Sequence, residues 1–309
     1  MRKYFYILAV LILFSCGGRG RTPAPKPSQA RAFPSVEIPA MISDPDQRLE
    51  FSVLHFWDNF LSSLVSKDTL LLNGVDPEEV ESQLGTFVTL AEMAPRKTAA
   101  EGVSRLFSKA EALGDRPLMD GMAALVRKYL YDPNSPVRDE DLYGAFVTPL
   151  SNSPLTDPLA RISLGFEAEQ CAKNAVGSIA ADFPFTDTAG KIRTLHGIKA
   201  PRTLLIFGNP DCQACREITE ALEADPDLRE MVRSGALAVV DVFIDREVDE
   251  WKAKVSAFPS SWICGYDHGF LIRDNLLYNV RGIPSLYLLD ADKRVLLKDA
   301  PVEKLFEAL

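Results

Sequence analysis

Basic residues are in short supply in this 309-residue chain. It has 34 Lys and Arg against 43 Asp and Glu, for a formal net charge of −9. Nucleic-acid binding draws much of its free energy from cations that neutralise phosphates, so this balance argues against DNA or RNA as a partner. The content of 47% apolar and 25% charged residues is that of an ordinary globular protein, and the length allows two domains.

A membrane-spanning run is also missing from the start of the chain. The apolar run at residues 4–14 is shorter than the roughly 20 residues that a spanning helix needs. It follows Arg2 and Lys3 and ends at Ser15-Cys16, which is typical of a signal peptide. The cysteine at this point resembles a lipobox, so we expect residues 1–15 to be removed and Cys16 to carry lipid. The alternatives are an ordinary signal peptide or a buried helix with an incidental cysteine.

Acidic residues are absent from the stretch that follows. Residues 16–34 are rich in glycine and proline and hold four basic side chains, a composition that favours an extended tether. The tether either lies against anionic headgroups or is a solvated linker. We therefore expect a membrane-anchored lipoprotein in the cell envelope that faces the periplasm. Thiols in that compartment are oxidised or have their redox state controlled by other proteins.

Residues 35–175 show helical patterning. Apolar residues recur at helical spacing from Leu49 to Leu64. Asp76-Pro77-Glu78-Glu79 indicates a helix start, with a cap, a first-turn proline and acids at the positive end of the dipole. Further helices are expected at 97–113, 118–130 and 158–173. This region is predicted to be an all-α domain, and it contains no recognisable catalytic constellation or repeat.

Residues 176–309 change to short strands that alternate with helices. Residues 236–244, ALAVVDVFI, have the β-branched content of a buried strand, and residues 202–207 indicate another. Further strands are expected at 192–195, 285–289 and 295–297, and helices at 215–222, from about 227, from 251 and at 302–309. The alternation predicts an α/β domain with a mixed sheet.

The sequence Cys212-Gln213-Ala214-Cys215 stands between the strand at 202–207 and a predicted helix. A strand–turn–helix places the first cysteine at a helix N-terminus, where free N–H groups and the helix dipole stabilise a thiolate. The spacing allows the two sulfurs to close a disulfide. Cys212 would then attack, and the more buried Cys215 would resolve the mixed disulfide.

These residues resemble the thioredoxin superfamily, most closely the TlpA/ResA-like exported thiol–disulfide oxidoreductases. The resemblance covers residues 176–309 and includes Ala181 to Lys191, the apolar Ile206-Phe207 and the segment from Tyr278 to Ser285. It implies a cis bond at Ile283–Pro284, which would expose the backbone of Ile283 beside the cysteines for pairing with a client strand. The alternative is a trans proline in an ordinary turn. Residues 35–175 resemble, more loosely, a helical domain of unknown function that precedes such modules in bacterial lipoproteins.

The sequence also departs from that family. The lead-in to the cysteines is Gly208-Asn209-Pro210-Asp211 instead of an aromatic-rich segment, and Ile206 stands where many thioredoxins carry a buried acid. The glutamate that follows the second cysteine in the family is met approximately by Glu217, which we take as a candidate for proton handling. Asp211 would oppose thiolate formation at Cys212.

Cys171 and Cys264 have no assigned role. They pair as a structural disulfide or remain buried thiols. Cys264, with His268 and the two cysteines of the motif, also resembles a zinc set. The sequence offers no second CxxC motif, and we expect no metal and no cofactor.

The expected function is thiol–disulfide exchange, more in the direction of a reductase by family analogy. Its partners would be protein thiols and disulfides, with a membrane electron-relay protein to recharge the cysteines. The alternative is a non-catalytic lipoprotein whose helical domain docks a partner on a thioredoxin-fold scaffold.

Overall fold

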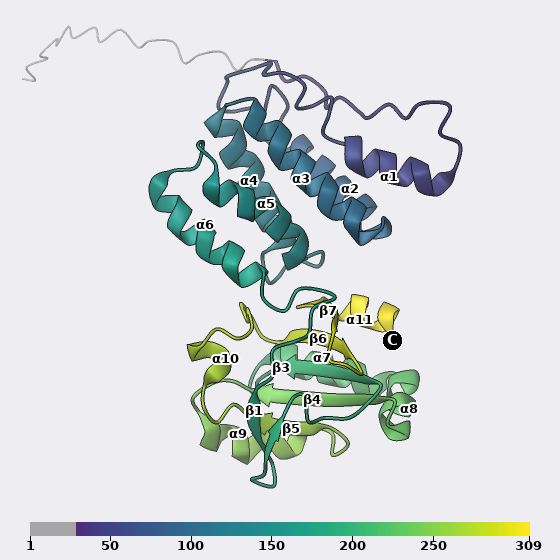
Figure 1. Cartoon of the computed structure of the whole chain (residues 1–309), viewed down its shortest axis with the longest axis vertical. Coiled ribbons are helices and arrows are strands. Elements are labelled where there is room, and N and C mark those ends of the chain that lie inside the picture. Colours follow the sequence, from purple (N-terminus) through teal and green to yellow (C-terminus); the bar gives the residue numbers. More distant parts are fainter. Residues whose placement is uncertain (1–28) are drawn as a thin grey trace, which may run out of the picture.

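The computed structural model describes residues 29–309. They form a helical domain, from Pro45 to Cys171, and a sheet domain, from Pro184 to Ala308, which are stacked one above the other in Figure 1. The predicted signal peptide, Cys16 and most of the tether lie outside the described residues. Within the described part, no helix is both long enough and apolar enough to span a membrane.

Aspartate caps start most of the helices in the helical domain. In five of the six helices, the side chain of an N-cap Asp accepts a backbone N–H from the first turn, which stabilises each helix by about 1 kcal/mol. In four of these helices a proline follows in the first turn. The helices are α1 (Pro45–His55), α2 (Pro77–Met93), α3 (Arg96–Ala112), α4 (Arg116–Leu130), α5 (Glu140–Asn152) and α6 (Pro158–Cys171).

The first helix is shorter than the sequence pattern predicts. The pattern extends to Leu64, but α1 ends at His55 and the chain continues in turns. Trp57, Phe60 and Leu61 are nevertheless buried in the core of the helical domain. The apolar spacing therefore reports burial correctly, and the helix assignment beyond His55 is wrong.

The sheet domain is built on one seven-stranded mixed sheet, with the strand order β2-β1-β5-β4-β3-β6-β7. The central strands β3, β4 and β5 are parallel, and their neighbours β1 and β6 are antiparallel to them. The strands are β1 (Pro184–Asp187), β2 (Ile192–Thr194), β3 (Arg202–Phe207), β4 (Leu237–Phe243), β5 (Ile263–Tyr266), β6 (Ser285–Asp290) and β7 (Val295–Leu297). The mixed α/β sheet predicted from the sequence is confirmed. The apolar patterning did not indicate β1 or β5; β1 lies in the segment 181–191, which entered the prediction through the family resemblance.

Helices accompany the sheet, and each of its faces buries a separate apolar core. Residues of α7, α8, α9 and α11 contribute to one core, whereas Ile272 of α10 belongs to the other. The helices are α7 (Gln213–Ala224), α8 (Pro226–Ser234), α9 (Val248–Lys254), α10 (Leu271–Asp274) and α11 (Val302–Ala308). Leucines, valines and aromatic residues therefore pack both faces of the sheet from which the turn with Cys212 extends.

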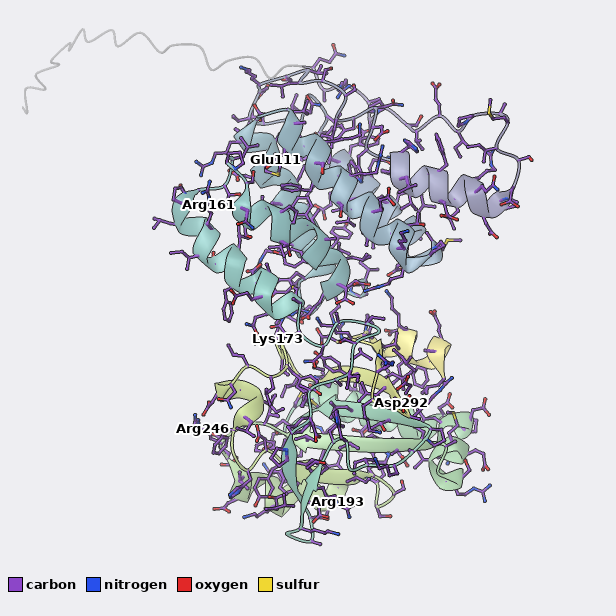
Figure 2. All side chains as sticks on the ribbon, viewed as in Figure 1. Glu111, Arg161, Lys173, Arg193, Arg246 and Asp292 are labelled. Atoms are coloured by element: carbon purple, nitrogen blue, oxygen red, sulfur yellow. The ribbon has the colours of Figure 1, made fainter. Side chains whose placement is uncertain are left out.

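The two domains meet across polar contacts at the end of α6. Lys173 lies at this junction in Figure 2, and its Nζ donates to the carbonyl oxygen of Leu276 at 2.5 Å. The side chain of Asn174 donates to the carbonyl oxygen of Leu277 at 2.8 Å. These bonds tie the helical domain to the segment that leads into β6.

Candidate active site

Cys212 is the N-cap residue of α7, at the turn that follows β3. Its Sγ accepts the backbone N–H of Cys215 at 3.3 Å, and its side chain is partly exposed. The sulfur therefore lies at the N-terminus of α7, where it accepts a backbone hydrogen bond and can be reached from solvent. The strand–turn–helix arrangement predicted from the sequence is the one observed.

The segment before β6 brings a second element to Cys212. The Ile283–Pro284 bond is cis, as expected from the sequence. The carbonyl oxygen of Ile283 lies 3.7 Å from the Cys212 Sγ and accepts a weak hydrogen bond from its thiol. Residues 71 positions apart therefore form one surface, on which a sulfur lies next to a backbone carbonyl.

Cys215 is buried behind Cys212, with 4% of its surface exposed. Burial raises the pKa of its thiol well above the ordinary value, and the hydrogen bond with Cys212 and the negative charge of Asp241 raise it further. Both cysteines are free thiols in the structure. The partly exposed sulfur of Cys212 is therefore placed to attack first, and the buried thiol of Cys215 remains protonated before it reacts.

Asp241 supplies a buried acid that the sequence analysis missed. It lies on β4 in register with Ile206 of β3, the position at which the analysis found no acid. Burial raises the pKa of Asp241 to about 7. The Oδ1 atom has no hydrogen-bond partner among the described residues, so the carboxyl group can exchange a proton without breaking a hydrogen bond at this oxygen.

Gly208 makes room for that carboxyl group. A Cβ atom at this position would lie 2.9 Å from Asp241 Oδ2, which is closer than van der Waals contact permits. The glycine therefore lets the acid lie against the turn that carries Cys212. A single acid inside the apolar run 236–244 was the available signal in the sequence.

Two acids near the motif are placed differently from what the sequence suggested. The carboxylate of Asp211 is paired with Lys254 Nζ at 2.6 Å, which offsets the repulsion expected at Cys212. Glu217 is exposed on α7, and its Oε1 accepts a hydrogen bond from Gln213 rather than from either thiol. Asp241 is therefore the better placed acid.

The two remaining cysteines of the described chain are buried free thiols in different domains. Burial raises the pKa of Cys171 to about 12 and also raises the pKa of Cys264 above its ordinary value. Among residues 29–309, no group of Cys, His, Asp and Glu side chains is arranged to hold a metal ion. The zinc alternative therefore lacks the geometry that it requires.

Comparison with known proteins places the chain in a family. The model of a domain of unknown function, DUF5106, matches residues 15–174, about half of the chain. The chain belongs to the DUF5106 family. The match includes all six helices of the helical domain, so in this DUF5106 protein the family domain precedes the sheet domain.

Solved structures identify the second half. A thioredoxin-like protein from Bacteroides caccae is 32% identical, with 90% of this chain and 98% of that one covered and a TM-score of 0.80. The C-terminal domain of an uncharacterised protein from Bacteroides fragilis is 41% identical over 45% of this chain and 99% of that one, with a TM-score of 0.44. The first of these similarities shows that the sheet domain of this DUF5106 protein is thioredoxin-like, as its sequence predicts.

A curated relative matches a shorter stretch. The probable nucleoredoxin 3 of Oryza sativa subsp. japonica is 31% identical over an alignment of 111 residues that covers 33% of this chain. The chain spans 23% of the length of that relative. Because the match covers only part of each chain, the activity of the whole plant protein is not transferred with it.

Proposed function

We propose that the chain is a thiol–disulfide oxidoreductase of the cell envelope that works mainly as a reductase. The observation that carries this proposal is the position of the Cys212 Sγ, between the N–H of Cys215 and the carbonyl oxygen of Ile283. This arrangement offers a nucleophile, a resolving thiol and a backbone acceptor for a client strand in one place.

The exchange begins at Cys212. Its thiolate attacks one sulfur of a client disulfide; a Cys212–client bond forms, the client S–S bond breaks, and the other client sulfur leaves as a thiolate. Cys215 then gives its proton to the Asp241 carboxylate and attacks the Cys212 sulfur, which releases the second client thiolate. The client gains two electrons, and Cys212 and Cys215 are left joined as a disulfide.

A further thiol donor must reduce that disulfide before the next cycle. We propose a membrane electron-relay protein for this role, because an anchored enzyme remains within reach of a membrane partner. The carboxyl group of Asp241 can return its proton to Cys215 at that stage, since its pKa lies near neutral pH.

The reduction potential of the Cys212–Cys215 couple tests the proposal. The full chain is equilibrated with dithiothreitol buffers, and the two thiols are counted by alkylation and mass spectrometry. A reductase predicts a two-electron transition near about −270 mV, whereas a value near about −120 mV belongs to an oxidase. The absence of a reversible transition at these residues would overturn the oxidoreductase proposal itself.

Membrane attachment through Cys16 is a separate proposal, supported by the position of this cysteine at the end of the apolar run. Cys16→Ser is expected to move the protein from the membrane fraction to the soluble fraction after cell fractionation, because it removes the only proposed acyl anchor. Cys171→Ser is the matched control and should stay with the membranes. Equal membrane retention of the Cys16→Ser protein would contradict the lipid anchor.

A further inference from the structure

The segment that carries the cis proline is held by the helical domain. The guanidinium group of Arg281 lies 4.1 Å from the ring centroid of Tyr131, and its Nε donates to Glu140 Oε1 at 2.8 Å. The side chain of Asn279 donates to the same carboxylate oxygen at 2.8 Å. Arg281 is two residues before Ile283, so α5 and the end of α4 fix the approach to the carbonyl group that faces Cys212.

The other end of the same segment is fixed through Asp299. This carboxylate accepts hydrogen bonds from Arg281 and from the hydroxyl of Ser285, both at 2.7 Å, and Ser285 directly follows the cis proline. Lys298 also contacts this set, with its Nζ 3.0 Å from Glu140 Oε2. We call Glu140, Arg281, Lys298 and Asp299 the interdomain charge cluster; no side chain in it is more than 10% exposed.

The helical domain also lies close to the backbone of the segment. A Cβ atom on Gly282 would lie 3.2 Å from the Cβ of Pro133, in the loop between α4 and α5. The glycine therefore allows the helical domain to lie directly against the residue before Ile283. Pro133 therefore covers part of the cis-proline segment, whereas Ile283 and Pro284 remain partly exposed.

Stability alone is a poor explanation for this arrangement. Buried ion pairs often stabilise a fold no better than apolar residues of the same volume, because desolvating the charges is costly, whereas they can hold a single geometry. Here the charges bracket the few residues whose backbone lies at Cys212.

We propose that the helical domain is a working part of the redox site: through the interdomain charge cluster and Pro133, it positions the Ile283 backbone for pairing with extended polypeptide clients. This inference rests on the proposed oxidoreductase function and names its substrate class. A client that pairs with the Ile283 backbone depends on the position of that backbone, and a small disulfide that reaches only Cys212 does not. Glu140 is thus a positioning residue.

The test compares two substrates in the full chain. Glu140→Gln removes one charge from the cluster and keeps the side-chain size. We expect its KM for insulin disulfides to rise about tenfold, the equivalent of about one lost hydrogen bond to the client. The rate with 5,5′-dithiobis(2-nitrobenzoate) should change less than about twofold, because this small disulfide does not pair with a strand. The reduction potential of the cysteines should change only slightly for the same reason.

Two further variants make the result decisive. Lys304→Gln is the matched control: it breaks the 2.7 Å ion pair between Lys304 and Glu92, which also joins the two domains but lies at α11 and α2. It should leave both substrates unaffected. Pro133→Gly removes the proline ring next to Gly282 without changing a charge and should act on insulin as Glu140→Gln does, so the test stands even where Glu140→Gln fails to fold.

Three outcomes would count against the inference. Equal losses on both substrates would mean a general structural role, and unchanged insulin kinetics in Glu140→Gln and Pro133→Gly would mean that the helical domain does not act on the site. Loss of insulin reduction in Lys304→Gln would mean that disturbing any interdomain contact impairs the site, so that the interdomain charge cluster has no special role. A wild-type protein that reduces neither substrate would instead overturn the proposed function, and this inference with it.

Discussion

Cys212→Ser is expected to reduce the rate of insulin disulfide reduction to that of dithiothreitol alone, a loss on the order of 10³-fold or more. The serine keeps the N-cap hydrogen bond to the backbone of residue 215, so the helix should persist. A hydroxyl group at this position cannot act as the attacking sulfur. The measurement is the turbidity of precipitating insulin chains, followed with equal amounts of wild-type and variant protein.

Cys171→Ser is the matched control for this loss, because Cys171 is a buried free thiol in the helical domain, outside the turn that carries Cys212. It should keep the wild-type rate. Wild-type activity in Cys212→Ser, or an equal loss in both variants, would contradict the assignment of Cys212 as the nucleophile.

Asp241→Asn is expected to remove a large pH dependence of stability. The pKa of Asp241 is about 7 in the folded protein, against an ordinary value of 3.8. Between these values the folded state holds a proton that the unfolded state has lost, so the free energy of unfolding falls as the pH rises from about 4 to about 7. The full decrease is up to about 4 kcal/mol, since each pKa unit corresponds to about 1.4 kcal/mol.

The measurement is urea unfolding at pH 5 and pH 8. The wild type should be less stable at pH 8, and the Asp241→Asn protein, whose amide does not titrate, should lose most of this difference. Asp292→Asn is the control, because Asp292 is exposed in the turn between β6 and β7 and its replacement should leave the pH dependence in place. A wild-type protein that is equally stable at both pH values would show that Asp241 is not held protonated by burial.

Local signals were sufficient for most of the fold. The Asp-Pro sequence at the start of α2 indicates both an N-cap residue and a first-turn proline. The apolar run of β4 indicates that this strand is buried. These features act over a few residues, so one sequence reveals them. The end of α1 at His55 was missed because turns can bury Trp57 and Phe60 as well as a helix can.

The site was predictable only in part, because its parts meet through strand register and domain packing. Asp241 comes next to the turn through its pairing with Ile206 across parallel strands, and nothing near either residue in the sequence fixes that register. Glu140 and Arg281 are 141 positions apart, and their contact depends on how two domains dock. The motif and the cis proline are local, and they were found.

Capture of a client by the Cys215→Ser protein shows most directly whether Cys212 is the attacking sulfur. Without the buried thiol, the mixed disulfide cannot be resolved and should accumulate. We predict that mass spectrometry of the trapped species will find the client cysteine joined to Cys212. Adducts at Cys171 or Cys264, or no adduct in a protein that still reduces insulin, would contradict the assignment of Cys212 as the nucleophile and Cys215 as the resolving thiol.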